Sequence, residues 1–198
     1  MGDWYYHFRG MFAFYFRLYN RLEVHGAEFV PGEGGLIVAS NHASYLDPMV
    51  LGAAMTRRMT YLAKEELFGM PLIGKFVSSF SFPVSRSKSS TSTIKETVRR
   101  LRAGEAIAIF PGGERAKEGD GADADFKKGI ELLVRMSEAN ILPAYINGTH
   151  RSLPVKGKFP KPSKINVRFG PPIIYGKDCS GKDDICLMVR DSIRRLCR

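Results

Sequence analysis

Apolar runs alternate with amphipathic stretches along most of the chain. Short runs that are apolar throughout are typical of buried strands, and apolar residues at every third or fourth position are typical of helices. By these patterns we expect strands at 22–25, 36–40, 59–63, 82–84, 106–110, 141–146 and 164–169, and helices at 48–56, 71–80, 90–102, 130–136 and 182–197. This alternation predicts an α/β protein with a layered sheet. Pro143 predicts that its strand lies at an edge or contains a bulge.

The first twenty residues are unusually rich in aromatic side chains. An apolar stripe at helical spacing contains Trp4, Phe8, Met11, Phe12, Tyr15, Leu18, Tyr19 and Leu22, and four more aromatic residues lie outside it at Tyr5, Tyr6, Phe14 and Phe16. Aromatic rings interspersed with arginines are typical of a helix in a membrane interface, whereas the stripe alone also suits a helix docked on a protein core. We predict an amphipathic membrane-interface helix at 1–20 and a separate domain at 21–198.

Size, charge and cysteine content narrow the class of protein. The 198 residues fit one domain, and 44% are hydrophobic, which is enough for a core. A formal charge of +10 predicts an anionic partner such as a phospholipid surface, a phosphorylated substrate or nucleic acid, unless it serves only solubility. The three cysteines form no disulfide framework and no zinc pattern, which favours a reducing cytosol. We expect no signal peptide and no membrane span.

The most informative segment is Asn41-His42-Ala43-Ser44-Tyr45-Leu46-Asp47-Pro48. It follows the apolar strand 36–40, and loops after strands are where α/β proteins carry their chemistry. Pro48 suits a first helical turn, and Asp47 before it is placed to cap that helix. A carboxylate can bond one nitrogen of an imidazole and leave the other to act as a base. Because no G-x-S-x-G motif supplies a nucleophile, the pair must activate a group that the substrate brings.

Cations follow other predicted strands in the same way. Lys64, Arg86 and Arg115 each lie at or just past the carboxyl end of a strand. Arginine binds phosphate as a bidentate fork and lysine as a point charge, so this repeated placement predicts a site for a phosphorylated molecule. The turn at Gly112-Gly113 could donate backbone N–H groups to a phosphate or an oxyanion.

Four sequence blocks, taken in order, carry a resemblance to a known family. They are N-H-x-x-x-x-D at 41–47, an apolar pair before an arginine at 82–86, Phe-Pro followed by an arginine at 110–115, and an apolar strand around a proline at 141–146. In order and spacing they resemble the glycerolipid acyltransferase family, and in particular the 1-acylglycerol-3-phosphate acyltransferases. The resemblance implies an α/β fold in which helices flank a central mixed sheet.

The resemblance also implies a reaction and a set of site residues. A thioester donor, acyl-carrier protein or coenzyme A, would pass its acyl group to lysophosphatidic acid and give phosphatidic acid. His42 would be the general base and Asp47 would fix its tautomer. The implied substrate-binding residues are Asn41, Lys64, Arg86, Pro111, Gly113 and Arg115. Neither a cofactor nor a metal is expected, and the implied location is the cytoplasmic face of a membrane, peripheral or monotopic.

The third block departs from the family pattern Phe-Pro-Glu-Gly-Thr-Arg-Ser. Gly112 replaces the glutamate, Glu114 the threonine and Ala116 the final serine. These changes affect the identity of the acceptor more than the reaction, so another lyso-lipid or a hydroxylated amino-lipid is an alternative acceptor. A non-catalytic basic protein that binds lipid or nucleic acid is a further alternative, although it gives the spacing of His42 and Asp47 no purpose.

Overall fold

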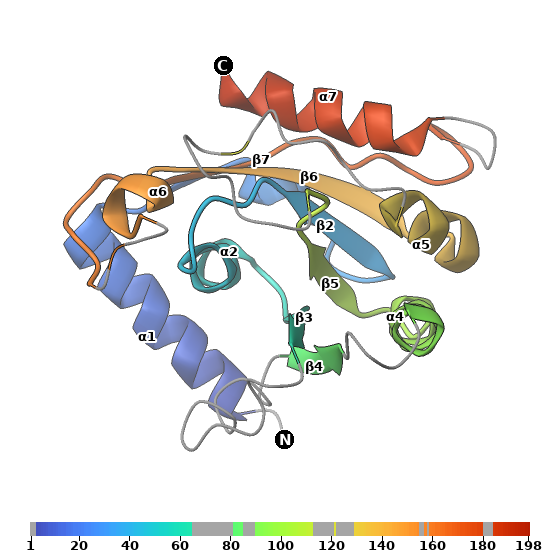
Figure 1. The fold of residues 1–198 in the computed structure, drawn as a ribbon, viewed down its shortest axis with the longest axis horizontal. Coiled ribbons are helices and arrows are strands. Elements are labelled where there is room, and N and C mark those ends of the chain that lie inside the picture. Colours follow the sequence, from blue (N-terminus) through green and yellow to red (C-terminus); the bar gives the residue numbers. More distant parts are fainter. Residues whose placement is uncertain are drawn as a thin grey trace.

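A computed structural model describes residues 3–64, 81–84, 90–112, 121, 129–154, 157, 159–179 and 184–198. Its centre is a seven-stranded sheet in the order β1-β7-β6-β2-β5-β3-β4 (Figure 1). The strands are β1 (Glu23–His25), β2 (Leu36–Ser40), β3 (Met59–Lys64), β4 (Ser81–Val84), β5 (Ala106–Ile109), β6 (Asn140–Asn147) and β7 (Asn166–Phe169). All neighbours are parallel except β6 and β7, which are antiparallel. The predicted α/β fold with a mixed sheet flanked by helices is confirmed.

Helices cover both faces of the sheet. Successive residues of β2 alternate between two apolar clusters, because side chains of a strand point to opposite faces in turn. One face packs against α1 (Asp3–Asn20) and α2 (Asp47–Ala54). The other packs against α4 (Ser90–Arg102), α5 (Gly129–Ser137) and α7 (Ile185–Cys197), so that α1 and α7 lie on opposite sides of the sheet (Figure 1). A 3₁₀ turn, η1 (Ala27–Phe29), and the short α6 (Thr149–Ser152) complete the described elements.

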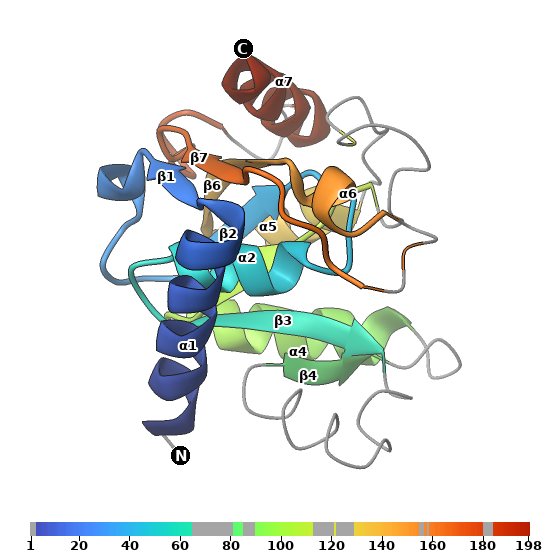
Figure 2. The same cartoon turned by 90° about the vertical axis from the view of Figure 1, so that its left-hand side faces the viewer.

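The predicted stripe of α1 coincides only in part with the side that faces the core, where Phe12 of the stripe packs and Leu22 is buried. Tyr5 and Phe16, which lie outside that stripe, are buried, and the Tyr5 hydroxyl accepts a hydrogen bond of 3.0 Å from the Met59 backbone N–H. Leu18, a member of the stripe, is 74% exposed. The helix crosses α2 on the outside of the fold (Figure 2). Most of its large apolar side chains are exposed.

The prediction that Pro143 marks an edge strand is wrong, because β6 lies inside the sheet between β2 and β7. The alternative of a bulge agrees with the pairing, since Ala144 pairs with Phe169 and Ile141 with Ile173, which leaves one extra residue in the partner segment opposite Pro143. The register between β6 and β7 ends at Ala144 and Phe169, so Pro143 lies just beyond it. Its carbonyl accepts a hydrogen bond of 2.9 Å from the Gly170 N–H. The backbone nitrogen and the carbonyl of a strand residue point to the same side. The proline nitrogen of Pro143, which carries no hydrogen, therefore faces the segment after β7, where it interrupts no hydrogen bond between β6 and β7.

Candidate active site

The carboxyl ends of β2, β5, β3 and β4 lie at one edge of the sheet, because these neighbouring strands run parallel. The loop that carries His42 follows β2, and Phe110 and Pro111 follow β5. Lys64 is the last residue of β3, so its backbone reaches the same edge. The convergence of strand ends that the sequence predicted is therefore present in the backbone.

His42 and Asp47 form a hydrogen-bonded pair at this edge. The distance from His42 Nδ1 to Asp47 Oδ2 is 2.8 Å, and the exposed fractions of the two side chains are 19% and 1%. A buried carboxylate beside Nδ1 favours the tautomer whose proton lies on that nitrogen. This tautomer leaves Nε2 as the basic atom, on a ring that a substrate can reach.

Asp47 does not cap α2 as predicted. The helix begins at Asp47 itself, and the preceding Leu46 makes no side-chain cap. Instead, Asp47 Oδ2 accepts hydrogen bonds from the backbone N–H groups of Ala43 at 2.7 Å and Ser44 at 2.8 Å. Its other oxygen, Oδ1, is buried and accepts no hydrogen bond from any residue that the structure describes. Asp47 Oδ2 thus fixes the conformation of the loop and also orients the imidazole of His42.

Asn41 fastens the start of the loop to β6. Its side-chain N–H donates to the Ile146 carbonyl at 2.7 Å, and its Oδ1 accepts from the Ile146 N–H at 2.7 Å. The side chain is buried among these bonds. Its contacts are those of a residue that positions His42, and the substrate-binding role given to it from the sequence stays a prediction.

Ser44 and Phe110 belong to the site but were not predicted from the sequence. The Ser44 hydroxyl donates to the Leu153 carbonyl at 2.8 Å and accepts from the Leu46 N–H at 3.2 Å. The ring of Phe110 stacks on His42 with 4.3 Å between ring centroids. A serine inside a loop often bonds nearby backbone groups, which was a usable signal. The stacking could not be predicted, because it joins residues 68 positions apart.

The predicted substrate-binding residues are only partly described. Pro111 is buried at the end of β5, next to Phe110. Lys64 has a described backbone, while Arg86, Gly113 and Arg115 lie outside the described residues, as do the predicted helix at 71–80 and the altered positions 114 and 116. Their roles therefore stay predictions.

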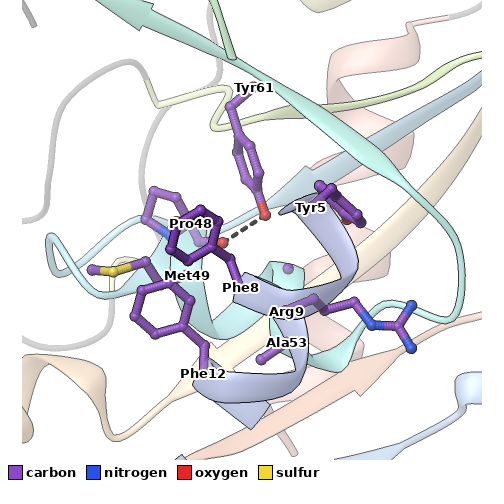
Figure 3. A pocket seen from close by; sticks show the side chains of 9 residues that line it. Tyr5, Phe8, Arg9, Phe12, Pro48, Met49, Ala53 and Tyr61 are labelled. Atoms are coloured by element: carbon purple, nitrogen blue, oxygen red, sulfur yellow. Dashed lines mark hydrogen bonds between the residues drawn. The ribbon is translucent and has the colours of Figure 1, made fainter. Parts of the chain in front are cut away.

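An apolar pocket opens between α1, α2 and β3. It begins at Pro48, the residue after Asp47, and its lining consists of Tyr5, Phe8, Arg9, Phe12, Pro48, Met49, Gly52, Ala53 and Tyr61. In Figure 3 the rings of Phe8 and Phe12 lie beside Pro48 and Met49, and the guanidinium of Arg9 extends away. Burial raises the pKa of Tyr61 well above its usual value, so its hydroxyl stays protonated and donates to the Pro48 carbonyl at 2.5 Å.

Comparison with known proteins identifies the family. The family model described as Acyltransferase matches residues 21–147, which include His42 and Asp47. A 1-acyl-sn-glycerol-3-phosphate acyltransferase from Bacillus subtilis is 32% identical over 155 residues, which cover 77% of this chain and 73% of the relative. This chain belongs to the acyltransferase family. The resemblance predicted from the four sequence blocks is confirmed.

Other relatives of this acyltransferase carry the same description. The 1-acyl-sn-glycerol-3-phosphate acyltransferases of Limnanthes alba and Cocos nucifera are 31% and 28% identical over 86% and 87% of the chain. The alignments span 61% and 56% of those two proteins. The crystal structure of the 1-acyl-sn-glycerophosphate (LPA) acyltransferase PlsC from Thermotoga maritima shares the fold of the acyltransferase, with a TM-score of 0.81 at 20% identity. That match covers 99% of this chain and 80% of the other.

Proposed function

We propose that this acyltransferase transfers a fatty acyl group from a thioester donor to the free hydroxyl of 1-acylglycerol-3-phosphate, giving phosphatidic acid for phospholipid biosynthesis. The observation that carries the proposal is the pair of His42 and Asp47, which lies inside the matched family region with a spacing of 2.8 Å. A base without a nucleophilic side chain suits a reaction in which the acceptor's own hydroxyl attacks.

The geometry suggests the order of bond changes. The acceptor hydroxyl oxygen attacks the thioester carbonyl carbon while His42 Nε2 takes the hydroxyl proton. Asp47, bonded to Nδ1, stabilises the imidazolium that forms. The tetrahedral intermediate then collapses, the carbon–sulfur bond breaks, and the imidazolium returns its proton to the departing sulfur. A backbone N–H of the turn at Gly113 would hold the oxyanion, and neither an acyl-enzyme nor a resident cofactor is required.

We propose that the cationic residues at the ends of the strands bind the phosphate of the acceptor. Lys64, Arg86 and Arg115 would bind it at the edge where His42 lies, with Arg115 as the bidentate ligand. The substitutions at Gly112 and Glu114 place a carboxylate beside Arg115 in sequence, which favours testing other lyso-lipids as acceptors. The decisive measurement is thiol release with lysophosphatidic acid and either acyl-carrier protein or coenzyme A thioesters. If only a different lyso-lipid were turned over, the proposed acceptor would be wrong and the proposed acyl transfer would stand.

The apolar pocket beside Pro48 is proposed to hold part of an acyl chain. We expect Ala53→Leu, which fills part of the pocket, to reduce kcat/KM for a palmitoyl donor about fourfold relative to a decanoyl donor, since one buried methylene contributes about 0.8 kcal/mol. Met49→Ala, which enlarges the same pocket, is expected to shift the ratio in the opposite direction. Competition between the two donors measures both variants. Unchanged ratios in both would place the acyl chain elsewhere.

We propose that the face of α1 that points away from the core contacts the cytoplasmic surface of a membrane. Among the described residues, no helix combines the length and hydropathy needed to cross a bilayer. The outer face nevertheless exposes large apolar side chains, namely Tyr6, Met11, Phe14, Tyr15, Leu18 and Tyr19. This helix lies along the outside of the fold in Figure 2. Exposed rings and aliphatic chains on one helix face suit burial at the level of lipid headgroups.

We expect the double variant Phe14→Asp/Leu18→Asp to lose at least about tenfold in affinity for vesicles of phosphatidylglycerol and phosphatidylethanolamine. Each lost side chain removes roughly 1.5–3 kcal/mol of apolar burial, and each 1.4 kcal/mol is tenfold in affinity. Co-sedimentation provides the measurement. The matched control is Leu132→Asp on α5, which is also exposed but lies on the other side of the sheet. Equal loss in the control would show a non-specific charge effect.

A further inference from the structure

The last turns of α7 form an arginine-rich surface. Residues 190–198 include Arg190, Arg194, Arg195 and Arg198, with Asp191 as the one acidic residue. The last three arginines are exposed, and the side chain of Arg190 is 28% exposed. Three of these arginines, together with Asp191, line a shallow hollow in the surface. We call this arginine-rich surface the α7 basic face.

An apolar cleft adjoins the α7 basic face. It lies between α7 and the segment 170–173, and its polar lining is Asp178, Asp191, Ser192 and Arg195. Its apolar lining consists of Pro143, Pro171, Pro172, Ile173, Met188 and Leu196. The cleft and the hollow share Asp191 and Arg195. The arginines of the hollow outnumber its one aspartate, so this side of the cleft is complementary to a protein surface that presents acidic side chains beside a few apolar ones.

The end of α7 is bonded to the strand that anchors the catalytic loop. The thiol of Cys197 donates to the Tyr145 hydroxyl at 3.2 Å, and Arg168 donates to the Leu196 carbonyl at 2.8 Å. Tyr145 precedes Ile146, which is the residue that holds Asn41 by two hydrogen bonds. The end of α7 is therefore linked through one strand to the residue before His42.

The two layers of the fold separate this surface from the proposed membrane contact. α1 covers one face of the sheet and α7 covers the other, as both views show (Figures 1 and 2). A bilayer that contacts the outer face of α1 therefore leaves α7 turned toward water. The charge of α7 then favours an acidic soluble partner over anionic lipid.

We propose that the α7 basic face docks a small acidic carrier protein that delivers the acyl thioester. The inference rests on the proposed function, since that reaction needs a thioester donor. A carrier protein docked there would extend the arm that bears its thioester toward the carboxyl edge of the sheet, where His42 takes the proton of the attacking hydroxyl. The docking contributes to recognition of the donor, and the proton transfer stays with His42.

The test compares two donors in the full-length protein. We expect Arg194→Glu/Arg198→Glu to reduce kcat/KM for acyl-carrier protein at least about tenfold and to change kcat/KM for acyl-coenzyme A less than about twofold, because like charges juxtaposed at an interface oppose association. Arg194→Lys/Arg198→Lys, which keeps the charge, should retain most of the activity with the carrier protein. The matched control is Lys95→Glu, an exposed position on α4, which should affect neither donor.

Each other outcome has a distinct meaning. Equal loss with both donors would overturn the inference, because the arginines would then bind a group common to both thioesters or support the fold, and a thermal melt separates these two cases. A matching loss of vesicle binding would assign the arginines to lipid. Wild-type turnover with acyl-coenzyme A alone would overturn the carrier site and leave the proposed function intact. Turnover with neither donor would instead contradict the proposed function itself.

Discussion

His42→Ala is expected to abolish acyl transfer while the protein stays folded. The base contributes about 10²–10⁴-fold to such a reaction, and a methyl group cannot accept the proton. The His42 side chain is 19% exposed and stacks on Phe110, so its removal leaves a cavity at the edge of the sheet and should cost some stability without unfolding the domain. Thiol release with lysophosphatidic acid measures the rate, and circular dichroism measures the fold.

His25→Ala is the matched control for this experiment. His25 is an exposed histidine on the edge strand β1 that faces Glu23 at 3.8 Å, and it has no contact with the catalytic loop in the described structure. Its removal should leave turnover within about twofold of wild type. If His42→Ala kept more than roughly a tenth of the wild-type rate, a general-base role for His42 would be excluded.

Asp47→Asn should lower kcat about 10²-fold or more while the catalytic loop keeps its shape. An asparagine carbonyl can take the place of Oδ2 and still accept the N–H groups of Ala43 and Ser44. The amide is neutral, so it stabilises the imidazolium far less than a carboxylate does. Its NH₂ group would occupy the buried place of Oδ1, which makes no hydrogen bond to any described residue, so a modest loss of stability is also expected.

A second carboxylate provides the control for Asp47→Asn. Hydrogen bonds from Arg99 and Arg100 lower the pKa of Glu96 to about 2, so Glu96 is charged throughout the assay range. Glu96→Gln on α4 removes the same charge far along the chain from the catalytic loop and should leave kcat unchanged. If Asp47→Asn left kcat as unchanged as Glu96→Gln does, the Asp47 carboxylate would stabilise only the loop and would not stabilise the imidazolium.

The sequence predicted most of the sheet because each strand has its own local signal. β2 and β5 are runs of apolar residues, and both are buried strands inside the sheet. The helix expected at 90–102 coincides with α4, whose apolar spacing and terminal glycine define it locally. His42 and Asp47 were also predicted as a bonded pair, since the loop between a strand and a helix brings them together.

The errors arose where a partner outside the local segment decides the outcome. The periodicity of α1 could not show which side faces the core, because nearly every side of that helix carries an aromatic residue. Pro143 lies inside the sheet at a place where the partner segment has one extra residue, between the pairs Ala144–Phe169 and Ile141–Ile173. Phe110 stacks on His42 through the pairing of β2 with β5, which no local pattern specifies.

The two hydrogen bonds between Asn41 and Ile146 have a consequence for how the protein opens. The side-chain amide of Asn41 takes the position that a backbone peptide group would hold, so it extends the pairing of β2 and β6 past Ser40. Local fluctuations of a segment cost what its hydrogen bonds and packing cost to break. The turn that carries His42 should therefore unfold together with the centre of the sheet and not with the surface loops. The His42 site should keep its geometry until the domain itself unfolds.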